Sequence, residues 1–242
     1  MNEIISSAAG ISLLLLFGVA IGLARRDLFS FAWLLAAAGL VFLNDALLTN
    51  GYGSIPDLTA ELEWNWQGKT LALLATLLVA ALPAFGWRRC GLTLVQKPGS
   101  LIAAIPVAAL YLMFFAALAW VFPSDGASSE TIAFQMTMPG LEEELFYRGI
   151  LLFALDRAFL SRVRFLGVDW GWGALLSCAL FGLAHAFGYS DGAFHFDPMI
   201  MALTAIPSFI AVWLRLRTGS VLLPILLHNL GNSMSFIMGK TG

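Results

Sequence analysis

The sequence predicts an all-α, polytopic membrane protein with about eight transmembrane helices. The chain has 242 residues, of which 60% are hydrophobic and only 12% are charged. Apolar runs recur from end to end, and several are near the roughly 20 residues that a helix needs to cross the hydrocarbon of a bilayer. No polar stretch is long enough to form a separate soluble domain, so a soluble enzyme is excluded.

Eight candidate membrane segments follow one another along the chain. They lie at about residues 7–24, 28–48, 70–87, 101–122, 140–160, 172–188, 198–216 and 219–238. Stretches rich in helix breakers separate them, such as "TNGYGSIPD" after the second segment, "QKPGS" before the fourth and "FPSDGASSE" after it. The first segment does not resemble a cleaved signal peptide, because its basic pair, Arg25 and Arg26, follows the apolar run.

Lys and Arg residues gather in alternate loops, which sets the expected orientation. Ten of the thirteen basic residues fall on one side: Arg25, Arg26, Arg88, Arg89, Lys97, Arg157, Arg162, Arg164, Arg215 and Arg217. By the positive-inside rule these loops face the cytoplasm. Both termini of this multi-pass protein are then extracytoplasmic, in the cell's inner (plasma) membrane. Lys69 and Lys240 are expected on the outer side, whose loops are acidic and include Asp125, and Arg148 lies within a segment.

The distribution of basic residues and the number of cysteines narrow the classes of partner and cofactor. No basic stretch suggests nucleic acid, so the expected partners are the lipid bilayer and a membrane-associated molecule. Cys90 and Cys178 are too few for a disulfide scaffold and are interpreted as small core residues. No cofactor or metal is expected.

Ionisable and other strongly polar groups at membrane depth are concentrated in three segments. The fifth carries Glu142, Glu143, Glu144 and Arg148, the sixth carries His185, and the eighth carries His228, Asn229 and Asn232. Ionisable groups in lipid cost several kcal/mol, so they usually face a protein interior and mark a functional path.

Each of these groups also has an ordinary structural explanation. Carboxylates in a first helical turn are stabilised by the helix dipole. A lone histidine is often a core residue bonded to a carbonyl, and polar residues on one helical face can hold helices together. The expected depth of these groups favours a functional site over the structural explanations, because all three sets fall in the outer half of the bilayer. Glu144 and Arg148 are four residues apart, and so are His228 and Asn232, so each pair shares a helical face.

This set of side chains suits hydrolysis by an activated water. A glutamate and a histidine that face one another can deprotonate a water and deliver it to a carbonyl. A second histidine and an asparagine can donate hydrogen bonds to the oxyanion that forms. No serine or cysteine is placed as an obvious nucleophile beside either histidine.

Three motifs carry a resemblance to a known family. "EELFYR" fits E-E-x-x-x-R with Glu143, Glu144 and Arg148, "FGLAH" fits F-x-x-x-H with Phe181 and His185, and "HNLGN" fits H-x-x-x-N with His228 and Asn232. Over about residues 95–238 the chain resembles the CAAX protease and bacteriocin-processing (CPBP, or Abi) family of intramembrane glutamic endopeptidases.

The resemblance implies a role for each motif residue. Glu143 and His185 activate water, and His228 and Asn232 form the oxyanion hole. Glu144, Arg148 and Phe181 support the site. Residues 95–242 are then a protease core whose catalytic centre lies in the C-terminal half, and residues 1–94 are N-terminal transmembrane helices without a motif.

Two alternatives stay open. The first is a zinc-dependent intramembrane metalloprotease, with Glu143, His185 and His228 as ligands. The second is a non-catalytic membrane scaffold or immunity protein that uses the polar cluster for packing. The preferred interpretation is an endopeptidase that cuts a membrane-anchored protein or peptide, on the extracytoplasmic side.

Overall fold

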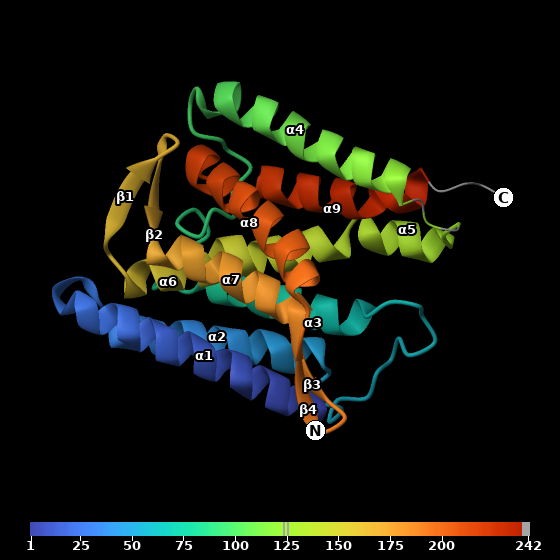
Figure 1. The fold of residues 1–242 in the computed structure, drawn as a ribbon, viewed down its shortest axis with the longest axis horizontal. Helices are drawn as coiled ribbons and strands as arrows, with labels where there is room; N and C mark the ends of the chain where they lie inside the picture. The colour runs from blue at the N-terminus through green and yellow to red at the C-terminus, as the bar shows by residue number, and fades with distance from the viewer. Residues whose placement is uncertain (123, 125, 239–242) are drawn as a thin grey trace.

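The structure is a computed structural model that describes residues 1–122, 124 and 126–238, and it is mostly helical (Figure 1). Its helices are α1 (Asn2–Ala24), η1 (Arg26–Leu28), α2 (Phe31–Leu48), α3 (Trp66–Ala81), α4 (Ser100–Val121), α5 (Ser129–Gln135), η2 (Gly140–Leu151), α6 (Leu152–Ala158), α7 (Trp172–Ala186), α8 (Pro198–Thr218) and α9 (Leu222–Ile237). The expected all-α polytopic class is confirmed. Asp125 and Lys240 lie outside the described residues.

The eight expected segments are all helical, but several are shorter than expected. Among the described residues, α1, α2, α4 and α8 are long and apolar enough to cross a membrane. Helix α3 has 16 residues and ends at Ala81, because Leu82 precedes a proline and adopts an extended conformation. Helix α7 has 15 residues and ends where the chain enters a β-strand at Phe187. The fifth segment is one continuous helical stretch made of η2 and α6.

Two β-hairpins and helix α5 were not expected. Strands β1 (Arg162–Phe165) and β2 (Val168–Gly171) form one antiparallel hairpin, and β3 (Phe187–Ser190) and β4 (Ala193–Phe196) form the other. Both turns place two consecutive residues at positive φ, as tight hairpins require: Leu166 with Gly167, and Asp191 with Gly192. The Asp-Gly pair is a recognisable hairpin signal in the sequence.

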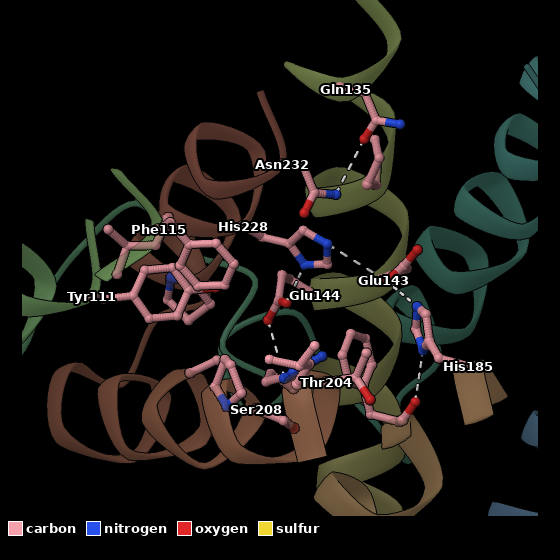
Figure 2. A pocket seen from close by; sticks show the side chains of 18 of the residues that line it. Tyr111, Phe115, Gln135, Glu143, Glu144, His185, Thr204, Ser208, His228 and Asn232 are labelled. Carbon is pink, nitrogen blue, oxygen red and sulfur yellow. Dashed lines mark hydrogen bonds and ion pairs between the residues drawn. The ribbon is translucent and has the colours of Figure 1, made fainter. Parts of the chain in front are cut away.

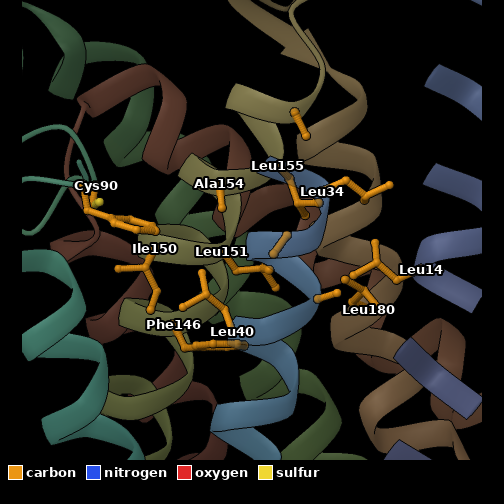
Figure 3. Close-up of a cluster of buried hydrophobic side chains, with 14 of the residues drawn as sticks. Leu14, Leu34, Leu40, Cys90, Phe146, Ile150, Leu151, Ala154, Leu155 and Leu180 are labelled. Carbon is orange, nitrogen blue, oxygen red and sulfur yellow. The ribbon is translucent and has the colours of Figure 1, made fainter. Parts of the chain in front are cut away.

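Helix η2 lies at the centre of the bundle. It contacts α2, α3, α6, α7, α8 and α9. Its apolar side chains, with those of α6, meet α1, α2 and α7 in a buried cluster that includes Leu14, Leu34, Phe146, Leu151 and Leu180 (Figure 3). Because lipid tails are as apolar as these side chains, association of the helices depends on close packing and on polar contacts. Because η2 contacts other helices on all these sides, its polar face is surrounded by protein rather than by lipid.

The two ends of the bundle differ in charge. Hydrogen bonds join the loops that carry most of the basic residues, such as Leu160 to Leu28 and Lys97 to Thr218. These loops and the β1–β2 hairpin lie at the left in Figure 1. The loop between α2 and α3, helix α5 and the β3–β4 hairpin lie toward the opposite end. We refer to these as the basic end and the acidic end.

Candidate active site

Two of the three consecutive glutamates, Glu142 and Glu143, lie in the first turn of η2, which is a π-helix over Gly140–Leu151, and Glu144 follows them. The i→i+5 hydrogen bonds of a π-helix give a wider turn than those of an α-helix, so consecutive side chains are rotated by a smaller angle. In η2, Glu142 and Glu143 contact α3, whereas Glu144 contacts α9. π-helical turns are rare and often occur at functional sites.

Gly140 allows η2 to approach α9 closely. A Cβ atom at this position would lie 2.6 Å from the carbonyl oxygen of Ile225. The Gly140 amide instead donates to Asn229 Oδ1 at 2.7 Å, and Asn229 Nδ2 donates to the carbonyl of Thr137 at 3.1 Å. Asn229 therefore fastens the start of η2 to α9.

Glu144 links the arginine of η2 to the histidine of α9. Its Oε2 atom lies 3.2 Å from Arg148 Nε, and both side chains are almost fully buried. Its Oε1 atom accepts from His228 Nδ1 at 2.7 Å. Because Nδ1 donates to a carboxylate, the other ring nitrogen, Nε2, is the one that faces the site (Figure 2). The expected Glu144–Arg148 pair is present.

Glu143 lies between the two histidines. Its Oε2 atom is 3.7 Å from His228 Nε2 and 4.0 Å from His185 Nε2. His185 Nδ1 lies 2.8 Å from the carbonyl oxygen of Phe181, which can only accept, so Nδ1 carries the proton. His185 Nε2 in the neutral ring is therefore an acceptor directed toward Glu143.

Lys69 is a member of this cluster that the sequence did not reveal. Its Nζ atom lies 2.5 Å from Glu143 Oε1 and 2.7 Å from Glu142 Oε2, and its side chain is only 14% exposed. The sequence predicts it to be an ordinary outer-side lysine. Instead, α3 delivers it into the bundle, where it neutralises part of the charge of two adjacent carboxylates.

Asn232 and Phe181 complete the set of motif residues. Asn232 Nδ2 donates to Gln135 Oε1 at 3.2 Å, so Gln135 at the end of α5 orients the amide. The Phe181 ring lies beneath the Arg148 guanidinium, with 4.1 Å between Arg148 Cζ and the ring centroid. The same ring is 4.7 Å from that of His185. Phe181 thus covers one face of the Arg148 guanidinium and supports one histidine.

A cavity of about 510 Å³ opens over these side chains. Glu143, His185, His228 and Asn232 line it on one side, and Tyr111, Phe115, Pro207 and Leu214 line it on another. Trp64, Asn65, Phe134 and Gln135 also line it, and they belong to the acidic end. Glu142 is fully buried and does not reach the cavity.

The structure brings together all seven residues that the motifs single out. Further polar residues line the same cavity, among them Lys69, Tyr111 and Gln135. Ser208 lines it as well, yet neither imidazole forms a hydrogen bond to a serine or cysteine in the part of the chain that the structure describes. In that part, no group of three or more His, Cys, Asp or Glu residues is arranged to hold a metal ion.

A comparison with family models identifies the C-terminal part of the chain. Residues 127–234 match the Rce1-like model, described as type II CAAX prenyl endopeptidase Rce1-like. All seven motif residues lie in this range, which confirms the resemblance, whereas Lys69 and Tyr111 precede it. The match covers fewer than half of the residues, and the description of the model is that of an endopeptidase. Neither the curated proteins nor the solved structures gave a match.

Proposed function

We propose that this chain is an intramembrane endopeptidase that hydrolyses a membrane-anchored protein or peptide with a water activated by Glu143 and His185. One observation carries the proposal. Within the 510 Å³ cavity, a single carboxylate oxygen of Glu143 faces the Nε2 atoms of two histidines, whose Nδ1 atoms are held by the Phe181 carbonyl and by the Glu144 carboxylate.

Glu143 and His185 suit the activation of water. Their facing atoms are 4.0 Å apart, which is too long for a hydrogen bond, but one water can bond to both at about 2.8 Å. Both atoms accept, so such a water donates its two protons to them and directs a lone pair at the scissile carbonyl. Glu143 takes one proton during attack and returns it to the leaving amine.

His228 and Asn232 suit the stabilisation of the oxyanion. His228 Nδ1 is held by Glu144, so Nε2 faces the cavity, where it donates to the oxyanion when it carries a proton. Asn232 Nδ2 has a second proton free beside the one given to Gln135. Removing one such donor from an oxyanion hole typically lowers kcat by about 10²–10³.

Lys69 holds Glu143 in place. Its bond to Oε1 leaves Oε2 for the water and the histidines, and its charge offsets the repulsion between Glu142 and Glu143. Lys69 does not contact the reacting atoms in this scheme. We therefore assign it a positioning role rather than a catalytic one.

The substrate is proposed to be cut at its extracytoplasmic membrane boundary. Two features support this side: the basic loops lie at the end of the bundle away from the α2–α3 loop and α5, and Trp64 and Phe134 of these elements line the cavity. The apolar wall formed by Tyr111, Phe115 and Leu214 suits a segment of chain that enters from lipid.

Cysteine labelling with a membrane-impermeant reagent tests the orientation. We expect Ser129→Cys, at the acidic end, to react in intact cells, and Ser161→Cys, at the basic end, to react only after lysis. Ser129 is exposed, whereas Ser128 caps α5 and is a poorer site. The parent chain gives the background, because Cys90 and Cys178 are fully buried. The reverse pattern places the cavity on the cytoplasmic side and favours a CAAX-like substrate.

Mapping of new amino termini tests the hydrolytic activity itself. The purified chain is added to solubilised membranes from cells that lack it, and amino termini are labelled before mass spectrometry. We expect a small set of new amino termini, each adjacent to a membrane anchor. A set of termini identical to that of an untreated extract favours a non-catalytic scaffold.

A further inference from the structure

An apolar groove lies near the basic end, away from the active-site cavity. Its volume is about 690 Å³, and α4, the β1–β2 hairpin, α7 and α8 form its walls. Val107, Phe165, Trp170, Phe209 and Trp213 are among its lining residues. Lipid-facing surfaces are apolar in any membrane protein, so the groove alone does not identify a ligand.

A second cavity of about 470 Å³ adjoins the same hairpin and carries an excess of positive charge. Its lining includes four basic residues, Lys97, Arg162, Arg164 and Arg217, and two acidic ones, Asp156 and Asp169. Asp156 pairs with Arg162 and Asp169 pairs with Arg164, each at 3.0 Å. After these two ion pairs, the positive charges of Lys97 and Arg217 are the ones that the acidic residues of the cavity do not neutralise.

These two cations have only carbonyl partners in the described part of the chain. Lys97 Nζ donates to the carbonyl of Leu216 at 3.0 Å, and Arg217 donates from a terminal nitrogen to that of Gly167 at 3.4 Å. The Nε atom of Arg217 is buried and has no hydrogen-bond partner. Gly99 and Ser100, at the start of the 22-residue helix α4, also line the cavity and add the positive end of a helix dipole. The two cations, the unpartnered Nε atom and the helix dipole together favour the binding of an anion.

The fold places the groove and the basic cavity on opposite faces of one hairpin. Side chains alternate along a strand, so Phe165 of β1 faces the groove while Arg164 faces the cavity. On α8, Trp213 lines the groove and Arg217, one turn further on, lines the cavity. Trp213 Nε1 donates to the carbonyl of Leu166 at 2.9 Å, which ties the hairpin tip to α8 between the two spaces.

We infer that the groove and the basic cavity together bind one anionic phospholipid, with an acyl chain in the groove and the phosphate head near Lys97 and Arg217. Leu166 lines the groove and its neighbour Gly167 lines the basic cavity, so the two spaces adjoin at the hairpin tip. Basic pockets between helices at the cytoplasmic boundary are suited to anionic head groups. This site is separate from the proposed catalytic centre, and binding at it does not depend on proteolysis.

Lipid binding to the purified, detergent-solubilised full chain tests the inference. The probes are dioleoyl phosphatidylglycerol, dioleoyl phosphatidylcholine with the same tails, and inorganic phosphate, each followed by native mass spectrometry and by thermal melting. We expect retention of phosphatidylglycerol and a raised melting temperature with it. Equal binding of phosphatidylcholine would overturn the inference, and stabilisation by inorganic phosphate alone would assign the cavity to a free anion.

Matched variants locate the site. Lys97→Gln with Arg217→Gln should weaken phosphatidylglycerol binding by about fivefold for each charge removed. The control is Arg25→Gln with Arg88→Gln, which removes the same charge from exposed positions outside the cavity. An equal loss in the control would mean that binding follows net charge and would refute a defined site. Val107→Phe, which fills the groove, should weaken binding without any change in charge.

Discussion

Glu143→Gln is expected to abolish hydrolysis while the protein stays folded and inserted. Glutamine keeps the shape of glutamate and can still contact Lys69, but it cannot accept the proton of an attacking water. General acid–base groups contribute roughly 10²–10⁴-fold to rate, so we expect a loss of about 10³-fold or more in kcat. The measurement is single-substrate turnover by the purified protein, with the melting temperature recorded in parallel.

Glu142→Gln is the matched control for this variant. Glu142 bonds to the same lysine, at 2.7 Å, and is its neighbour in the same π-helix, but it does not line the cavity. If the only role of the two glutamates were to bond Lys69, both variants would show a similar loss of kcat. The proposed mechanism predicts that Glu142→Gln retains most of its kcat. Near-normal turnover by Glu143→Gln would eliminate Glu143 as the base.

Arg148→Ala should both destabilise and inactivate the protein. Arg148 is 1% exposed, pairs with Glu144 and lies over the Phe181 ring, so its removal leaves a buried carboxylate uncompensated. Breaking a buried ion pair in this way typically costs about 3–5 kcal/mol. Thermal melting in detergent measures the loss, and Arg157→Ala is the control, because Arg157 also lies over an aromatic ring but is exposed.

A second substitution separates the two effects of Arg148. In a Glu144→Gln background the carboxylate is gone, so Arg148→Ala should cost much less stability than it does alone. Activity should remain low in the double variant, because His228 has lost the carboxylate at Nδ1. An unchanged melting temperature in Arg148→Ala alone would show that the arginine does not stabilise the fold.

Much of the helical fold was predictable because membrane helices leave a strong signal. The apolar length of each segment and the alternation of basic loops require no tertiary information. The β-hairpins were missed although "YSDGAF" contains a hairpin turn and "RVRF" alternates basic and apolar residues. The π-helical form of η2 was missed too, because nothing in its sequence distinguishes a π-helix from an α-helix.

The parts of the candidate site whose residues lie close together in the sequence were predictable. Glu144 and Arg148, or His228 and Asn232, share a helical face whatever the rest of the chain does. Lys69 was missed because its partners lie 73 and 74 positions away and on another helix. A lysine near the start of an apolar helix ordinarily lies at the membrane boundary. Only the packing of α3 against η2 brings it to the glutamates.

The central claim is that Glu143 and His185 activate water without a metal. Metal dependence tests it most directly, because Glu143, His185 and His228 would be the ligands in the alternative zinc enzyme. The purified wild-type chain is treated with a strong chelator, its metal content is measured, and the new amino termini that it produces in the solubilised membranes are mapped again. The mechanism based on Glu143 and His185 predicts the same termini at the same rate in metal-free protein. Loss of these termini on chelation, with recovery on addition of zinc, would contradict it.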